Sequence, residues 1–348
     1  MRKKILSILK YLVFLGIGLY LVWWQVGKMT DIQKTEFIDS LKNMHYWYLV
    51  PVILMGVVSH ISRAIRWNIL IEPMGYKPST ANSFYSLFCG YFANLFVPRA
   101  GEILRCTLLS RYEKIPFSKL VGTVIVERIV DLFSYFLIIL ITFLIQITTV
   151  TDFIKEKIGA ISGGEKSMPL WIKLSIVAGV ILLMLVAAKL LFSKFKGHAF
   201  TDKIKKIIHG LTEGFLTIMK LKRKKAFIAH SIFIWTLYLL QVYVGFSALS
   251  QTSHLGIEVA FSVLSLSTLA MIISPGGIGA FPVAVQQVLL IYNVDNISFG
   301  WLVWGVNTVI ILVLGILCFG ILIHSNKIKT GKFPKYETVD LPVKNEEE

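Results

Sequence analysis

Charged side chains are scarce in this sequence. Asp, Glu, Lys and Arg make up 16% of its 348 residues, whereas soluble globular chains carry about a quarter. Hydrophobic residues make up 55%, and the mean hydropathy is +0.69. This composition excludes a water-soluble globular protein, and we expect lipid to surround most of the chain.

Cysteine and the common catalytic motifs are also scarce. Cys89, Cys106 and Cys318 form no CxxC pair and lie in or beside apolar segments, so we expect them to be unpaired. The seven histidines form no HExxH motif, and no His/Cys cluster has metal-ligand spacing. The P-loop pattern GxxxxGK[ST] is missing. We therefore predict no metal, no cofactor, no nucleic-acid partner and no catalytic residue.

Long apolar runs dominate what is present. Six runs are long enough to span a membrane, at residues 5–26, 46–67, 120–149, 169–193, 226–250 and 298–324. Two further apolar regions, 82–109 and 258–292, are interrupted by proline, glycine and charged residues. If each interrupted region enters and leaves on one side, 28 of the 36 Lys and Arg residues fall on the cytoplasmic side.

This charge bias predicts an all-α polytopic membrane protein with about six full spans and two re-entrant helical hairpins. The hairpins would enter from opposite sides, as in an inverted repeat that places a site near the bilayer midplane. The alternative is that glycine and proline only kink ordinary spanning helices. We expect one transmembrane domain over residues 1–325, both termini in the cytoplasm, and a bacterial cytoplasmic (inner) membrane location.

Two segments differ from this pattern. Residues 200–225 place apolar side chains at helical spacing among lysines, which predicts a basic amphipathic helix on the inner membrane surface. A solvated linker helix is the alternative. Residues 326–348 are polar and end in three glutamates, which predicts a disordered cytoplasmic tail.

Ionisable side chains inside apolar segments are candidates for function, because a buried charge in lipid must be paired. Three groups qualify, in the stretches RAIRW, PRAGEILR and VERIVDL: Arg63 and Arg66; Arg99, Glu102 and Arg105; and Glu127, Arg128 and Asp131. For the first group, snorkelling to the membrane interface is an alternative.

The third group carries two carboxylates, at Glu127 and Asp131, on one helix face. Arg128 suits only one of them, so we expect Arg99 or Arg105 from the neighbouring hairpin as the partner. The network either locks hairpin to helix or holds an arginine for an anionic headgroup, and these roles are compatible.

The second interruption is the stretch SPGGIGAFP, with Pro275, Gly276, Gly277 and Gly279. A helix that restarts after such a break presents unpaired N–H groups and a partial positive charge. Glycines let a phosphate approach this backbone. We expect a side chain at Gly277 to block that approach with only a modest loss of stability.

The stretches RAIRW, NLFVPRAGEILR, VIVERIVDLFS and ISPGGIGAFPVAV together resemble the membrane region of lysylphosphatidylglycerol synthases. That region also occurs alone in the flippase-like (YbhN-like) family. The resemblance covers residues 5–325 and implies lipid handling or flipping. Aminoacyl transfer belongs to a soluble domain that these residues lack. Related regions accompany archaeal glycosyltransferases acting on polyprenyl lipids, so such lipids stay open as substrates.

From these patterns we predict a flippase or transporter for an anionic, aminoacylated or polyprenyl-phosphate-linked lipid. Arg99 and Arg105 would contact the phosphate. The alternatives are an intramembrane enzyme acting on lipid phosphates, with Glu127 and Asp131 as acid and base, and a non-catalytic partner of a separate transferase. We expect membrane lipids as partners, with a lipid-modifying enzyme and a second copy of the chain as further alternatives.

Overall fold

The computed structural model describes residues 22–27, 29–97, 99–158 and 221–330, with positions 16, 20 and 219. Every regular element in those ranges is a helix, as predicted. The elements are α2 (Asp31–Lys42), η1 (Tyr46–Tyr48), α3 (Leu49–Ile71), η2 (Glu72–Met74), α4 (Thr80–Phe96), α5 (Ala100–Glu113), α6 (Phe117–Ile158), α9 (Lys224–Phe246), α10 (Ile257–Ile273), η3 (Pro275–Gly277), α11 (Ala280–Ile291) and α12 (Ser298–Thr330).

Four stretches in the described ranges are long and apolar enough to cross a membrane. They are Tyr46–Met74, Phe117–Gln146, Lys224–Phe246 and Ser298–His324. These stretches correspond to four of the predicted spans. The spans predicted at 5–26 and 169–193 lie largely or wholly outside the described residues, as does most of the amphipathic helix predicted at 200–225. Helix α12 continues to Thr330, past the predicted domain boundary at residue 325.

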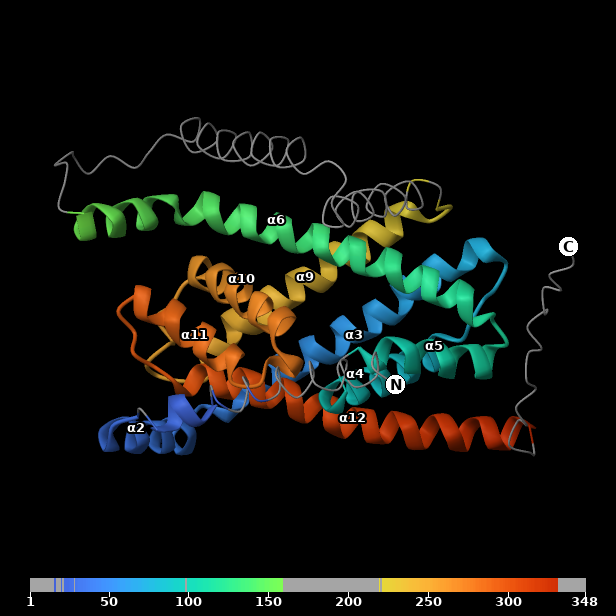
Figure 1. Cartoon of the computed structure of the whole chain (residues 1–348), viewed down its shortest axis with the longest axis horizontal. Helices are drawn as coiled ribbons and strands as arrows, with labels where there is room; N and C mark the ends of the chain where they lie inside the picture. The colour runs from blue at the N-terminus through green and yellow to red at the C-terminus, as the bar shows by residue number, and fades with distance from the viewer. Residues whose placement is uncertain are drawn as a thin grey trace, which may run out of the picture.

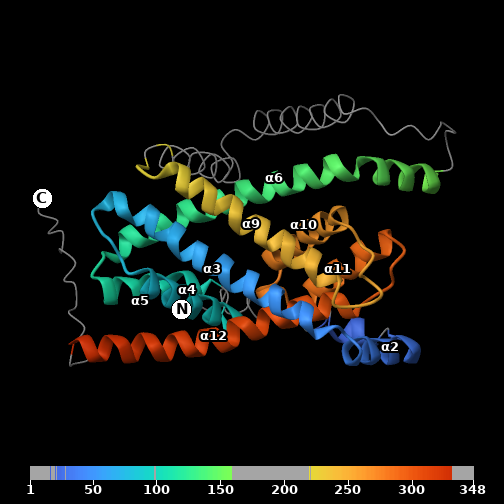
Figure 2. The same cartoon turned by 180° about the vertical axis from the view of Figure 1, so that it is seen from behind.

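The long helices form the frame of the molecule (Figures 1 and 2). Helices α6 and α12 run along two opposite sides, and α3 and α9 cross between them. Helices α3 and α9 pack closely on each other. A glycine permits this approach, because a Cβ at Gly56 of α3 would lie 2.8 Å from Nε2 of Gln241 on α9. That amide donates a hydrogen bond to the carbonyl of Val52 at 2.9 Å.

The element order repeats within the chain. Helices α3 to α6 and helices α9 to α12 each comprise a long helix, a pair of short helices and a second long helix. The packing is reciprocal: α4 of the first unit contacts α12 of the second, and α10 of the second contacts α6 of the first. The structure thus shows a repeated order of elements, while the inverted repeat, with short helices entering from opposite membrane faces, stays a prediction.

The first hairpin turns sharply between α4 and α5. Arg99 at the turn has the left-handed backbone conformation, with φ of 65°. Gly90 and Gly101 lie where the two helices touch, and a Cβ on Gly90 would come within 2.7 Å of the Gly101 carbonyl oxygen. The Asn94 side chain accepts a hydrogen bond from the Gly101 N–H at 2.7 Å. This contact satisfies one of the free donors at the start of α5.

The second hairpin turns through glycines. Helix α10 ends before Ser274, and Gly276, Gly277 and Gly279 then have φ of 61°, 73° and 69°. Glycine adopts these values without the steric penalty that a Cβ brings. The glycines that interrupt this apolar stretch therefore allow the chain to reverse direction before α11.

The turn of the second hairpin packs beside the end of α4 in the first hairpin. The pairs α4–α5 and α10–α11 lie toward opposite ends of the long axis in Figure 1, and η3 of the second hairpin packs against α4 of the first. A Cβ on Gly276 would lie 3.7 Å from Cδ2 of Leu95. Trp304 of α12 holds the second turn by donating to the Gly276 carbonyl at 2.8 Å.

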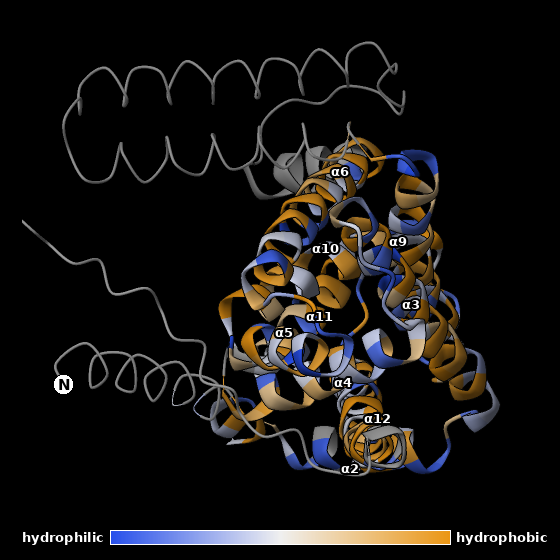
Figure 3. Cartoon of the chain, turned by 90° about the vertical axis from the view of Figure 1, so that its right-hand side faces the viewer, coloured by the Kyte–Doolittle hydropathy of each residue, from blue (hydrophilic) through white to orange (hydrophobic). Residues whose placement is uncertain are grey.

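The outer surface of the long helices is apolar. Figure 3 shows hydrophobic residues along most turns of these helices. Large side chains point away from the protein, with exposed fractions of 70% for Phe133, 63% for Ile232 and 60% for Ile316. Exposed apolar surface on this scale marks contact with a membrane or a partner, and acyl chains would cover it in a bilayer.

Candidate functional site

A cluster of arginines and carboxylates lies between α3, α5 and α6. Arg63 and Arg66 are three residues apart on α3, so they share one face of that helix. Glu127 and Asp131 are four apart and share a face of α6. Arg105 joins them from α5. We call these five residues the arginine cluster.

The ion pairs of the arginine cluster are short. Arg63 Nη1 lies 3.2 Å from Glu127 Oε1 and 2.9 Å from Asp131 Oδ2. Arg66 Nη2 lies 2.6 Å from Asp131 Oδ1 and 3.6 Å from Glu127 Oε1. Arg105 Nη2 lies 2.9 Å from Glu127 Oε2. Each carboxylate is therefore shared by at least two guanidinium groups.

The arginine cluster is buried and has an excess of positive charge. Arg66 and Glu127 have no exposed surface, Arg105 is 1% exposed and Arg63 is 6% exposed. Three guanidinium groups face two carboxylates, so the cluster carries one uncompensated positive charge. Burying an uncompensated charge is unfavourable, and a bound anion would neutralise it.

Neighbouring side chains orient the guanidinium groups. The Arg105 guanidinium lies 4.8 Å from the centre of the Trp67 ring, and Trp67 Nε1 donates to Thr123 Oγ1 at 2.8 Å. From α9, Ser231 accepts a hydrogen bond from Arg66 at 3.1 Å, and Tyr238 accepts one from Arg63 at 3.3 Å. Sequence reasoning missed these two α9 residues, although their seven-residue spacing places both on one face of a largely apolar helix.

Several guanidinium donors in the cluster lack a hydrogen-bond acceptor. Within the described residues, no acceptor is found for Nε of Arg63, Arg66 or Arg105, or for Nη1 of Arg105. Buried donors are rarely left without partners in folded proteins. Arg105 has two such nitrogens on different edges of one guanidinium, and either can donate to an oxyanion.

Two predicted site residues, Glu102 and Arg128, lie at the edge of this cluster. Arg128 Nη2 lies 3.1 Å from Glu102 Oε1, and the two side chains are 44% and 30% exposed. Glu102 Oε2 also lies 3.5 Å from Asn94 Nδ2. Arg128 Nη1 approaches Asp131 Oδ2 at 4.0 Å. This pair joins the first hairpin to α6 nearer the surface.

The structure decides between the alternatives that the sequence left open for the arginines. Arg99 is exposed at the hairpin turn and forms no ion pair with Glu127 or Asp131. Arg105 is the hairpin partner instead, because it lies six residues, or about 9 Å, along α5. Arg66 does not snorkel to an interface, since it is fully buried among the carboxylates.

The second hairpin contributes no residue to the arginine cluster. Met271 Sδ, Phe281 and Trp304 crowd the position that a Cβ on Gly277 would occupy, with Phe281 Cβ 3.2 Å and Trp304 Cδ1 3.4 Å from it. A side chain there would have to displace these groups at a positive φ, so the structure favours a larger loss of stability than the sequence alone suggests. The Gly277 N–H points back to the Ser274 carbonyl at 3.3 Å.

The described residues contain no group of three or more His, Cys, Asp or Glu side chains placed to hold a metal ion. Cys89, Cys106 and Cys318 are free and buried.

A contact between α3 and α9 was not predicted from the sequence. Ser62 Oγ of α3 lies 2.8 Å from Nδ1 of His230 on α9.

Curated relatives of this chain are archaeal membrane proteins. The chain is 24% identical to a UPF0104 membrane protein of Pyrococcus horikoshii, over 82% of this chain and 88% of the relative. It is also 24% identical to one from Methanocaldococcus jannaschii, over 85% and 86% of the two chains. A third, from Methanothermobacter thermautotrophicus, is 22% identical over 70% and 75%. No solved structure matches the chain.

The family assignment agrees with the apolar helices, and the predicted resemblance is confirmed. The chain is an integral multi-pass membrane protein. Residues 7–315 match the family described as the lysylphosphatidylglycerol synthase transmembrane region, and the chain belongs to that family.

Proposed function

We propose that this protein moves an anionic lipid between the two leaflets of a membrane, and that the arginine cluster binds the lipid phosphate during passage. The observation that carries the proposal is Arg105. It is buried, it belongs to a cluster with one excess positive charge, and two of its nitrogens have no acceptor within the described residues. A phosphate oxyanion supplies the missing charge and an acceptor for one of these nitrogens.

The ion pairs give the site a means to release its ligand. Each guanidinium that turns toward a phosphate can return to Glu127 or Asp131 when the lipid leaves, so the arginines keep a partner in both states. Aminoacylated and polyprenyl-phosphate-linked lipids carry the same phosphate chemistry and remain within the proposal. Without a P-loop motif, we infer that an ion gradient or the lipid gradient itself drives the movement.

Orientation and location follow from the charge bias. We propose that both termini face the cytoplasm and that each hairpin enters and leaves the membrane on one side. The curated relatives are archaeal, so we extend the proposed location to the cytoplasmic membrane of bacteria or archaea. A separate lipid-modifying enzyme and a second copy of the chain are the partners we propose to test for by co-purification.

The experiment is lipid translocation in proteoliposomes with fluorescent phosphatidylglycerol and dithionite quenching. Arg105→Lys retains the charge that faces Glu127 but loses the planar fork of donors. We expect translocation to fall about tenfold, the effect of one lost charge-assisted contact, with little change in melting temperature. Arg111→Lys is the matched control, because Arg111 is on the same helix outside the arginine cluster. Equal rates for both variants would contradict the proposal.

One contact favours a second candidate, an intramembrane enzyme acting on lipids. A serine hydroxyl 2.8 Å from an imidazole nitrogen is the pairing used in nucleophilic catalysis, and Ser62 is next to Arg63 in the chain. The carboxylates suit acid–base work poorly, because arginines occupy their oxygens. Thin-layer chromatography of lipid incubated with pure protein separates the two, since an enzyme changes the lipid and Ser62→Ala would stop it.

A further inference from the structure

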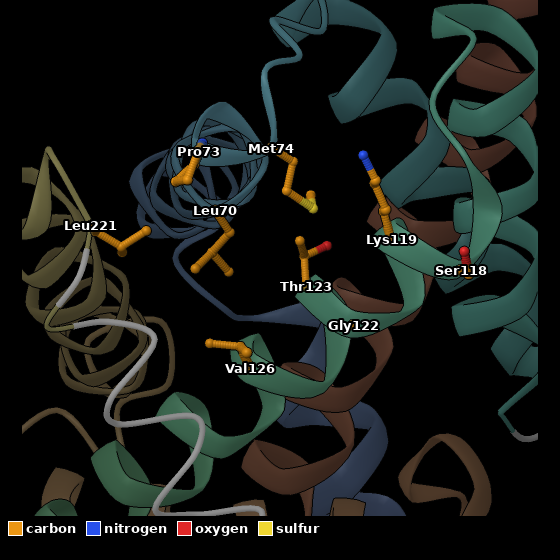
Figure 4. A pocket seen from close by; sticks show the side chains of 9 residues that line it. All are labelled: Leu70, Pro73, Met74, Ser118, Lys119, Gly122, Thr123, Val126 and Leu221. Atoms are coloured by element: carbon orange, nitrogen blue, oxygen red, sulfur yellow. The ribbon is translucent and has the colours of Figure 1, made fainter.

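A pocket of about 440 Å³ opens between the end of α3, the start of α6 and the segment before α9. Figure 4 shows Leu70 and Met74 from the α3 side, Val126 from α6, and Leu221 from the segment before α9. Its size lies within the range of about 300–1,000 Å³ typical of ligand sites. The walls are apolar, so the occupant must present hydrocarbon.

The mouth of the pocket is basic. Lys119 lines it and is exposed, with its ammonium 5.0 Å from the centre of the Tyr76 ring. Leu221 lines the pocket from the other side, and Lys222, Lys224 and Lys225 follow it in exposed positions. Hydrocarbon walls with Lys119 in the lining, and three more exposed lysines close in sequence to Leu221, fit an amphiphile with an anionic head. Another apolar pocket, between α2, α3 and α12, has no ionisable residue in its lining.

The pocket lies next to the arginine cluster. Thr123 lines it and accepts the hydrogen bond from Trp67 Nε1 at 2.8 Å. The other side of Trp67 faces Arg105, whose guanidinium lies 4.8 Å from the ring centre. Thr123 and the Trp67 ring therefore lie between the pocket and the Arg105 guanidinium.

We infer that this pocket is the entry site for one anionic phospholipid from the membrane leaflet at this end of the helices. An acyl chain occupies the walls formed by Leu70, Val126 and Leu221, and Lys119 holds the phosphate beside Thr123. The inference rests on the proposed function, because it makes the pocket the route by which the headgroup reaches Arg105.

A glycine in the pocket lining provides a position at which a substitution can obstruct the pocket. Gly122 lines the pocket, and a Cβ added there would meet no atom within 4 Å. Gly122→Leu therefore puts a bulky side chain into the pocket from a position where its Cβ meets open space, and leucine favours the helix more than glycine does. Gly320→Leu on α12 is the matched control, because that position is exposed and equally open.

The probe is phosphatidylglycerol with a diazirine in its acyl chain, added to the full-length protein in detergent, with the same diazirine on phosphatidylcholine for comparison. We expect crosslinks on the peptides that carry Leu70 and Val126, with phosphatidylglycerol preferred. Gly122→Leu should reduce them at least about fivefold, and Lys119→Gln should remove a preference of about fivefold, the effect of one lysine on an anionic lipid. Gly320→Leu should crosslink like the wild type.

Crosslinks that survive Gly122→Leu, or equal crosslinking of both lipids, would overturn the inference. Translocation by the same variants separates it from the proposed function. Slower translocation by Gly122→Leu, with normal translocation by Gly320→Leu, supports both the entry site and the proposed function. A wild type that crosslinks here but moves no lipid overturns the proposed function and leaves the pocket as a lipid site. Gly122→Leu moving lipid at the wild-type rate overturns the entry role.

Discussion

Arg105 of the first hairpin and Glu127 of α6 meet at 2.9 Å with both side chains almost fully excluded from solvent. Only one nitrogen of Arg105 is used by this ion pair, while Nε and Nη1 find no acceptor among the described residues. The same guanidinium thus fastens the hairpin to a long helix and keeps donors for another anion. Structural and ligand-binding roles are joined in one residue.

Removing the shared carboxylate should destabilise the protein. Glu127 faces Arg63, Arg66 and Arg105, so Glu127→Gln leaves three buried guanidinium groups with Asp131 alone. Loss of one partner from a buried ion pair costs about 3–5 kcal/mol. We expect a clearly lower melting temperature in detergent, measured by the loss of the monodisperse peak in size-exclusion chromatography after heating.

Neutralising Arg105 as well should restore part of that stability. The double variant Arg105→Gln, Glu127→Gln removes one positive and one negative charge together, so it should melt above Glu127→Gln alone. If the double variant loses as much as the two single variants added together, Arg105 and Glu127 do not interact as the distances indicate.

Asp131 should be coupled to Arg66 and not to Arg99. Asp131 Oδ1 lies 2.6 Å from Arg66 Nη2, whereas Arg99 is exposed at the hairpin turn. A double-mutant cycle of Asp131→Asn with Arg66→Gln should give an interaction free energy of about 0.5–3 kcal/mol. The cycle with Arg99→Gln should be additive within about 0.5 kcal/mol. The measurement is unfolding in detergent, and coupling to Arg99 would contradict the structure.

Side chains at the second turn should differ in their effect on stability. Gly276 has φ of 61° but open surroundings, with Leu95 Cδ2 3.7 Å from an added Cβ. Gly276→Ala should therefore cost only the left-handed penalty of about 1–2 kcal/mol. Gly277→Ala adds a collision with Met271 and Phe281, so it should melt at a lower temperature. Equal melting temperatures would show that the neighbours yield freely.

Membrane orientation of the hairpins can be read from cysteine labelling in cells. If each hairpin enters and leaves on one side, single cysteines at Pro78 and Glu113 should label only from the cytoplasm. Cysteines at Ser253 and Asn293 should label only from outside. The native cysteines are buried and should react slowly. Opposite labelling within either pair would mean that the region between the two residues crosses the membrane once.

Local composition was enough to predict the helical class and the two interruptions. Apolar runs of about 20 residues can only be helices in lipid, because each backbone group must find a partner within its own segment. Gly276, Gly277 and Gly279 reverse the chain as expected, since their positive φ values suit glycine. The shared face of Glu127 and Asp131 also followed from spacing alone.

Which charges pair was decided only by tertiary packing. The sequence offers Arg63, Arg99 and Arg105 alike as charged residues in apolar segments. Spacing along one helix does not say which neighbouring helix each side chain will face. Packing of α3 and α5 on α6 selects Arg63, Arg66 and Arg105 and leaves Arg99 at the turn. The crowding around Gly277 and the Ser62–His230 contact likewise involve residues far apart in the sequence. A local sequence pattern cannot predict such contacts.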